Sequence, residues 1–121
     1  MANINNDTAG SACIEINLEA GRPGTRDAIE RLRGEIAAAR RRGIHCLYII
    51  HGYGSSGRGG AIREEVRATL ERMKNSGTVK NYIKGEDFSI FNSAALAMKR
   101  RYPALDKLTR VCNHGVTVVE L

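Results

Sequence analysis

Residues 47–65 read LYIIHGYGSSGRGGAIREE. The first four residues are apolar and end at His51, five glycines and one arginine follow between Gly52 and Gly60, and a charged helical pattern then begins. An apolar run that leads through glycines into an amphipathic segment is typical of a buried strand followed by a helix. This order of elements predicts an α/β fold, and the flanking sequence extends it in both directions.

The rest of the chain alternates between strand patterns and helix patterns. Alternating or unbroken short apolar runs predict strands, and apolar residues three or four apart predict helices. Thr25 is expected to cap the first helix, and Gly43 to end it. We expect strands at 13–18, 44–50, 78–83 and 116–121, helices at 25–42, 61–74 and 89–101, and a polar loop at 106–114.

This β-α-β-α-β-(α)-β order predicts a sheet covered by helices, with residues 44–50 as the central strand. Residues 1–11 are small and polar and are expected to form a disordered tail. The predicted domain therefore spans residues 12–121.

The composition restricts the partner and the compartment. Nineteen Lys and Arg against 13 Asp and Glu give a net charge of +6, which favours an anionic partner such as nucleic acid, a phosphate ligand or an anionic membrane surface. Cys13, Cys46 and Cys112 are an odd number without CxxC spacing, which argues against a disulfide scaffold or a zinc site and favours the cytoplasm. No apolar run approaches the ~20 residues that span a bilayer, so we expect no membrane-spanning segment.

A glycine-rich turn between a strand and a helix is suited to binding an anion. The first N–H groups of a helix have no intrahelical acceptor and carry a partial positive charge. Glycines let the backbone approach a phosphate closely, and the planar guanidinium of Arg58 matches phosphate oxygens. These features predict a nucleic-acid backbone site, and the alternative is a mobile connection with no ligand.

Two nucleotide motifs fit this stretch less well. Residues 52–57 match GxGxxG, but the acidic residue expected about twenty positions on, at the end of a second strand, is Glu71 inside the second predicted helix. We therefore expect no dinucleotide. Gly54 and Gly59 have the spacing of GxxxxGK[ST], but Gly60 and Ala61 stand where that loop has its lysine and hydroxyl residue.

The sequence His51-Gly52-Tyr53-Gly54 after an apolar strand resembles the HGxG signature of the Smr (small MutS-related) domain, and residues 115–121 look like that domain's last strand. The resemblance covers residues 13–121 and suggests a stand-alone Smr protein. It implies an α/β two-layer sandwich with a four-stranded mixed sheet, similar to the C-terminal domain of a bacterial translation initiation factor. It also implies nucleic-acid binding and, in several members, nicking endonuclease activity on DNA or RNA.

The first strand departs from the family pattern. Nuclease-active members usually carry Leu-Asp-x-His there, and this chain has Ile14-Glu15-Ile16-Asn17. Asparagine does not titrate near neutral pH, so Asn17 cannot replace histidine as a general acid or base. The resemblance therefore implies binding more than hydrolysis. Its catalytic candidates are Glu15 and His51, and a divalent metal is expected as cofactor only if the protein is a nuclease.

The predicted site combines the loop backbone with nearby side chains. Tyr53 could stack on a base or fold back on the sheet. Two charge clusters, at residues 40–42 and 99–101, are either solvated helix ends or a second phosphate contact. A protein-interaction module without nucleic-acid contact is a further alternative. The predicted nucleic-acid-binding residues are His51, Gly52, Tyr53, Gly54, Ser55, Ser56, Arg58, Gly60 and Arg63.

Overall fold

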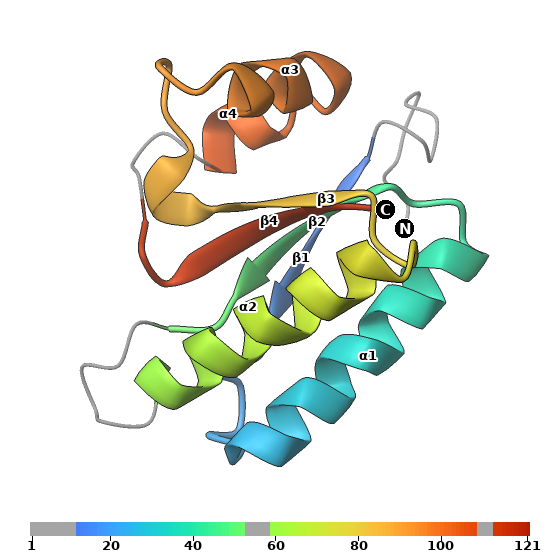
Figure 1. The fold of residues 1–121 in the computed structure, drawn as a ribbon, viewed down its shortest axis with the longest axis vertical. Coiled ribbons are helices and arrows are strands. Elements are labelled where there is room, and N and C mark those ends of the chain that lie inside the picture. Colours follow the sequence, from blue (N-terminus) through green and yellow to red (C-terminus); the bar gives the residue numbers. More distant parts are fainter. Residues whose placement is uncertain (1–11, 53–58, 109–112) are drawn as a thin grey trace.

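The computed structural model describes residues 12–52, 59–108 and 113–121 (Figure 1). The predicted tail at residues 1–11 lies outside this part of the chain. The elements, in chain order, are β1 (Cys13–Asn17), α1 (Thr25–Arg41), β2 (Cys46–Ile50), α2 (Gly59–Asn75), β3 (Asn81–Lys84), the 3-10 helix η3 (Gly85–Asp87), α3 (Ser93–Arg101), α4 (Leu105–Leu108) and β4 (Val116–Glu120).

The four strands form one mixed sheet in the order β1-β2-β4-β3. Strands β1 and β2 are parallel and are joined by the crossover helix α1, whereas β4 runs antiparallel to both of its neighbours. Strand β2 is interior and almost wholly buried, as its unbroken apolar sequence predicts for a strand that is covered on both faces. Strand β4 is also interior and buried along its whole length.

Helices cover both faces of the sheet (Figure 1). Long helices α1 and α2 pack on one face through Leu32, Ile36, Val66 and Leu70, which meet Leu47 and other strand residues in a first core cluster. Short helices α3 and α4 pack on the other face in a second cluster. The predicted sandwich of helices on a four-stranded mixed sheet is confirmed, and α3 and α4 add a smaller layer on its second face.

Several element boundaries differ from the sequence expectation. The predicted N-cap at Thr25 is wrong, because Gly24 takes that position and no side chain caps α1. The predicted end at Gly43 is confirmed, since this glycine follows the helix with a φ of +73°. Strand β3 begins at Asn81 rather than at Thr78, because the N–H groups of Thr78 and Val79 bond back to the Met73 carbonyl of α2.

The polar segment after Pro103 is partly helical, although a loop was expected over residues 106–114. Leu105 is fully buried in the second cluster, and the Tyr48 hydroxyl of β2 donates to the carbonyl of Leu108 at 2.9 Å. These two contacts hold the short helix α4 against the sheet. No helix in the described ranges has the length and apolar character needed to cross a membrane.

Candidate functional site

His51 follows β2 and is fully buried on the α2 side of the sheet. Its Nδ1 lies 2.8 Å from the carbonyl oxygen of Gly52, and its Nε2 lies 2.9 Å from Oγ1 of Thr117. Because a carbonyl only accepts, Nδ1 carries the proton and Nε2 accepts from the Thr117 hydroxyl. Burial lowers the pKa of His51 to about 4, and the charges of Arg67 and Arg63 act in the same direction. His51 is therefore neutral near pH 7.

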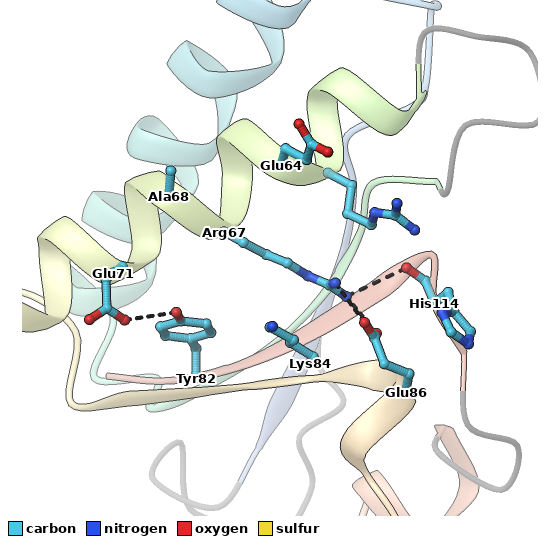
Figure 2. A pocket seen from close by; sticks show the side chains of 9 residues that line it. Glu64, Arg67, Ala68, Glu71, Tyr82, Lys84, Glu86 and His114 are labelled. Carbon is cyan, nitrogen blue, oxygen red and sulfur yellow. Dashed lines mark hydrogen bonds and ion pairs between the residues drawn. The ribbon is translucent and has the colours of Figure 1, made fainter.

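Arg67 on α2 connects this histidine to η3. Its Nε donates to Thr117 Oγ1 at 3.0 Å, and its two terminal nitrogens donate to the two carboxylate oxygens of Glu86 at 2.8 Å each (Figure 2). Burial alone would raise the pKa of Glu86, but the hydrogen bonds from Arg67 outweigh it and hold that pKa below its usual value. We call the continuous chain His51–Thr117–Arg67–Glu86 the His51 network.

A pocket of about 490 Å³ opens beside this network, between α2 and β3 (Figure 2). Two of its carboxylates are already engaged, because Glu86 is held by Arg67 and Glu71 accepts a hydrogen bond from the Tyr82 hydroxyl at 2.8 Å. Arg63 and Lys84 also line the pocket, and neither side chain makes a hydrogen bond or ion pair with the described part of the chain. These two cations remain free to meet an anion.

The N-terminus of α2 adds a positive partial charge close to the pocket. Helix α2 begins with Gly59 and Gly60, two residues earlier than predicted, and its first turn holds no acidic residue. Helix α1, in contrast, has Asp27 in its first turn. No carboxylate within the first turn of α2 therefore offsets the positive end of its dipole, which favours an anion. Arg63 follows one turn later and extends this surface.

Gly52 fixes the beginning of the glycine-rich loop. Its φ of +79° lies in the region that favours glycine, and a Cβ at this position would overlap the Glu19 carboxylate. The backbone N–H groups of His51 and Gly52 both donate to the carbonyl of Gly115, at 2.9 and 3.1 Å. The loop therefore starts from a position held between the turn after β1 and the start of β4.

The two predicted catalytic residues lie on opposite faces of the sheet. Ile14 and Ile16 pack in the first cluster with α1 and α2, so Glu15 between them points to the other face, where it is exposed. Its register partner Tyr48 belongs to the second cluster. His51 lies on the α2 side, and the structure does not bring it together with Glu15. A catalytic role for either residue stays a prediction.

Asn17 makes a local contact where nuclease-active members usually have histidine. Its Oδ1 accepts a hydrogen bond from the backbone N–H of Glu19 at 2.8 Å, which stabilises the turn that follows β1. The same turn places the Glu19 carboxylate beside Gly52. The amide of Asn17 therefore supports the turn that carries Glu19 to the start of the loop.

The structure describes four of the predicted binding residues, His51, Gly52, Gly60 and Arg63. The other five, Tyr53, Gly54, Ser55, Ser56 and Arg58, lie outside the described residues.

Sequence reasoning missed the residues that join this region together. Arg67 lies four positions after Arg63 on α2, and Thr117 is a polar residue in an apolar strand, so both carried a signal. Nothing in the sequence marked Glu86, Lys84 or Glu19 as residues of this region. Within the described ranges, no three His, Cys, Asp or Glu side chains are placed to hold a metal ion.

The fold and the site define a small α/β domain in which a glycine-rich sequence links an interior strand to a long helix whose first turn holds no acidic residue. A family model for the Smr domain matches residues 24–87, just over half of the chain. The chain therefore belongs to the Smr domain family. The match covers α1 to η3 and includes the loop and Arg67, whereas β1 and β4 lie outside it. No curated protein and no solved structure matched the chain.

Proposed function

We propose that this protein binds the phosphate backbone of a nucleic acid at the N-terminal end of α2. The observation that carries the proposal is the first turn of α2, which holds no acidic residue. It lies at the glycine-rich loop of an Smr domain, beside Arg63 and Lys84, whose side chains form no ion pair with the described residues. Helix N–H groups and basic side chains are the donors that phosphates receive in nucleic-acid complexes. Arg58, which lies outside the described residues, is a further cation in the sequence of this loop.

The buried side chains of the His51 network position this surface. His51 holds the carbonyl of Gly52, and Arg67 holds η3 through Glu86. Both ring nitrogens of His51 are engaged inside the protein, so we assign it to positioning the loop rather than to contacting phosphate. Arg63 and Lys84 contact phosphate in this proposal.

The two alternative functions receive less support. A nicking endonuclease built on Glu15 and His51 needs both residues at one substrate, and they lie on opposite faces of the sheet. A protein-interaction module without nucleic-acid contact rests on the altered first-strand motif alone. Backbone binding agrees best with the charges that remain free around α2.

Fluorescence anisotropy over a range of salt concentrations tests the proposal. The probes are labelled single-stranded and duplex DNA and RNA of mixed sequence. Each phosphate contact contributes about 0.7 to 0.9 to the slope of log K against log salt, so Arg63→Ala and Lys84→Ala should each weaken binding and lower that slope by roughly one.

Arg72→Ala is the matched control for this experiment. Arg72 also lies on α2, but near its C-terminal end and paired with Glu65. Its removal changes the net charge equally and should leave the slope close to that of the wild type. The proposal is wrong if no probe binds at low salt, or if Arg72→Ala weakens binding as much as Arg63→Ala.

A further inference from the structure

The net positive charge of the chain is not concentrated in the pocket beside α2. Three cationic side chains line that pocket, Arg63, Arg67 and Lys84, together with the three carboxylates Glu64, Glu71 and Glu86. The pocket is therefore close to neutral, although the chain carries a net charge of +6. The excess positive charge of the chain is therefore carried by residues outside this pocket.

Arg40 and Arg101, one from each charge cluster of the sequence, lie at the opposite end of the sheet from the glycine-rich loop. Lys99 of the second cluster instead pairs with Asp106 at 4.0 Å and lies over the Phe88 ring. Arg40, in the last turn of α1, donates to the carbonyl of Thr78 in the turn before β3 at 2.6 Å. In that same turn, the N–H of Lys80 donates to the carbonyl of Glu120 at the end of β4 at 2.8 Å. Arg101, at the end of α3, donates twice to the Glu120 carboxylate at 2.9 Å.

Figure 1 shows the end of α1, the start of β3 and the end of β4 on one side of the molecule, and the start of α2 on the other. A helix of 17 residues is about 25 Å long, which gives the separation of the two ends. Six exposed cationic residues come from the end of α1, the turn before β3 and the end of α3, and we call them the basic rim: Arg40, Arg41, Arg42, Lys80, Arg100 and Arg101.

The carboxylate of Glu120 takes part in the contacts that join these segments, and its two oxygen atoms already accept hydrogen bonds. Glu120 is buried and accepts two hydrogen bonds from Arg101 and one from the Tyr102 hydroxyl at 2.7 Å. The other five cations of the basic rim form no ion pair with the described residues. Helix dipoles account for basic residues at the ends of α1 and α3, but not for Lys80 on a turn between them. Gathering like charges costs stability through repulsion, which a polyanionic partner would relieve.

We propose that the basic rim is a second contact site for the sugar–phosphate backbone of a nucleic acid, at the opposite end of the domain from the glycine-rich loop. This inference rests on the proposed function. Exposed guanidinium groups on several segments suit a phosphate backbone, which presents regularly spaced charges along an extended surface. No base-reading contact is needed at this site.

The test removes rim cations that make no structural contact. Arg41, Arg42 and Arg100 have no side-chain hydrogen bond to the described residues, so the triple alanine variant should fold. Its control removes equal charge from exposed positions outside the rim as Arg26→Ala, Arg33→Ala and Lys107→Ala. The probe is a labelled duplex of about ten base pairs or more, since each pair rises 3.4 Å and about 25 Å must be spanned. The rim variant should lower the salt slope by about two to three, and the control by less than one.

The outcomes separate this inference from the proposed function. If the rim variant matches its control while Arg63→Ala weakens binding, the rim is not a contact site and the proposed function stands. If the rim variant lowers the slope while Arg63→Ala and Lys84→Ala do not, the rim is a site and the loop is not. If the wild type binds no probe, both proposals are wrong.

An independent observation concerns two thiols at this end of the sheet. Cys13 and Cys46 are register partners on the parallel strands β1 and β2, both are free, and Sγ of Cys46 lies 3.1 Å from Sγ of Cys13. Neighbouring strands lie about 4.8 Å apart, which is within the Cα separations that disulfides span. Cys13 is half-buried and Cys46 fully buried, so a reagent in solution reaches Cys13 first.

We infer that Cys13 and Cys46 form a reversible disulfide with a small-molecule disulfide as the oxidant. The Cys13 thiolate attacks the small disulfide, forms a mixed disulfide and releases one small thiolate. The hydrogen bond to Cys13 and burial both raise the pKa of Cys46, so its proton must leave before its thiolate attacks Cys13 Sγ and releases the second small thiol. Two protein thiols and one small disulfide thus become one protein disulfide and two small thiols.

Mass spectrometry and thiol counting test this inference in a Cys112→Ser background. Treatment with glutathione disulfide should remove both thiols and leave a protein lighter by two hydrogen atoms, without an adduct, and dithiothreitol should restore both. In Cys46→Ser the reaction should stop at the glutathione adduct on Cys13. The inference is wrong if the parent protein keeps both thiols or accumulates a stable adduct.

Discussion

Each end of the sheet holds an arginine paired with a glutamate, and the two pairs differ in which partner is buried. Near the loop, Arg67 is 13% exposed and Glu86 is 23% exposed. At the basic rim, Glu120 is 3% exposed whereas Arg101 is 49% exposed. The loop end therefore encloses a guanidinium, and the rim end encloses a carboxylate.

This difference indicates different roles for the two arginines. All three nitrogens of the Arg67 guanidinium donate inside the protein, to Glu86, Thr117 and the carbonyl of Val116, so it organises the site from within. The exposed half of Arg101 leaves part of its guanidinium facing solvent, where it can meet a partner while it neutralises Glu120. Near the loop, Arg63 and Lys84 instead form no ion pair with the described residues.

The largest expected effect comes from removing Arg101. Arg101→Ala leaves the buried Glu120 carboxylate with Tyr102 as its hydrogen-bond donor, and breaking a buried pair costs about 3 kcal/mol or more. Glu120→Gln should cost less, because Arg101 can extend into water. Urea denaturation measures both. The double variant should be more stable than Arg101→Ala alone, and equal losses in both single variants would contradict the burial asymmetry.

The next effect is an acid-dependent loss of stability from His51. Its folded pKa of about 4 lies below the unfolded value of 6.5, so the unfolded state gains the proton first. Stability should fall as the pH drops below 6.5 and level off below about 4, with a loss of about 2 to 3 kcal/mol by about pH 4.5. Glu86 and Glu120, whose folded pKa values are lowered, lose their contributions at still lower pH.

Thermal unfolding across this pH range distinguishes the source of the effect. His51→Gln should remove most of the loss between pH 6.5 and 4.5, whatever its stability at neutral pH. His45→Gln makes the same substitution at an exposed histidine and is the control for the change of residue type. An unchanged pH dependence in His51→Gln would show that the His51 network does not hold a neutral imidazole.

The smallest expected effect is a gain in the stability of the folded protein. It comes from a substitution in the middle of α1, away from both ends of the sheet. Gly34 lies inside α1, and a Cβ there would meet nothing within 4 Å. Gly34→Ala should therefore stabilise the protein by roughly 0.5 to 1 kcal/mol through helix propensity. The same urea experiment checks it, and this variant provides a background in which both ends can be weakened without unfolding. A loss of stability would contradict the open environment of Gly34.

The elements that local patterns define were predictable from the sequence. The apolar run before His51 gave the interior strand, and Gly43 gave the end of α1. Helix α4 was missed because burial of Leu105 against the sheet, rather than local periodicity, stabilises it. Its four residues are too few for a pattern to show.

From the sequence alone, the candidate site could be predicted only for residues that lie close together in the chain and whose side chains or backbone suit the same ligand. The glycines and Arg63 lie close together in the sequence, so a site there could be proposed from the sequence alone. The His51–Thr117 contact joins residues 66 positions apart, and the Arg67–Glu86 pair joins residues 19 apart, so both depend on strand order and register. The opposite faces of Glu15 and His51 follow from the same register and not from residue type.

Backbone amide shifts during an NMR titration with a short single-stranded oligonucleotide test the central claim most directly. Binding at the loop end should shift the amide signals of Gly52, Gly59, Gly60 and Arg63 first and most, and Arg63→Ala should reduce those shifts. A bound oligonucleotide that moves only signals of α3 and α4, and leaves the first turn of α2 unchanged, would contradict it.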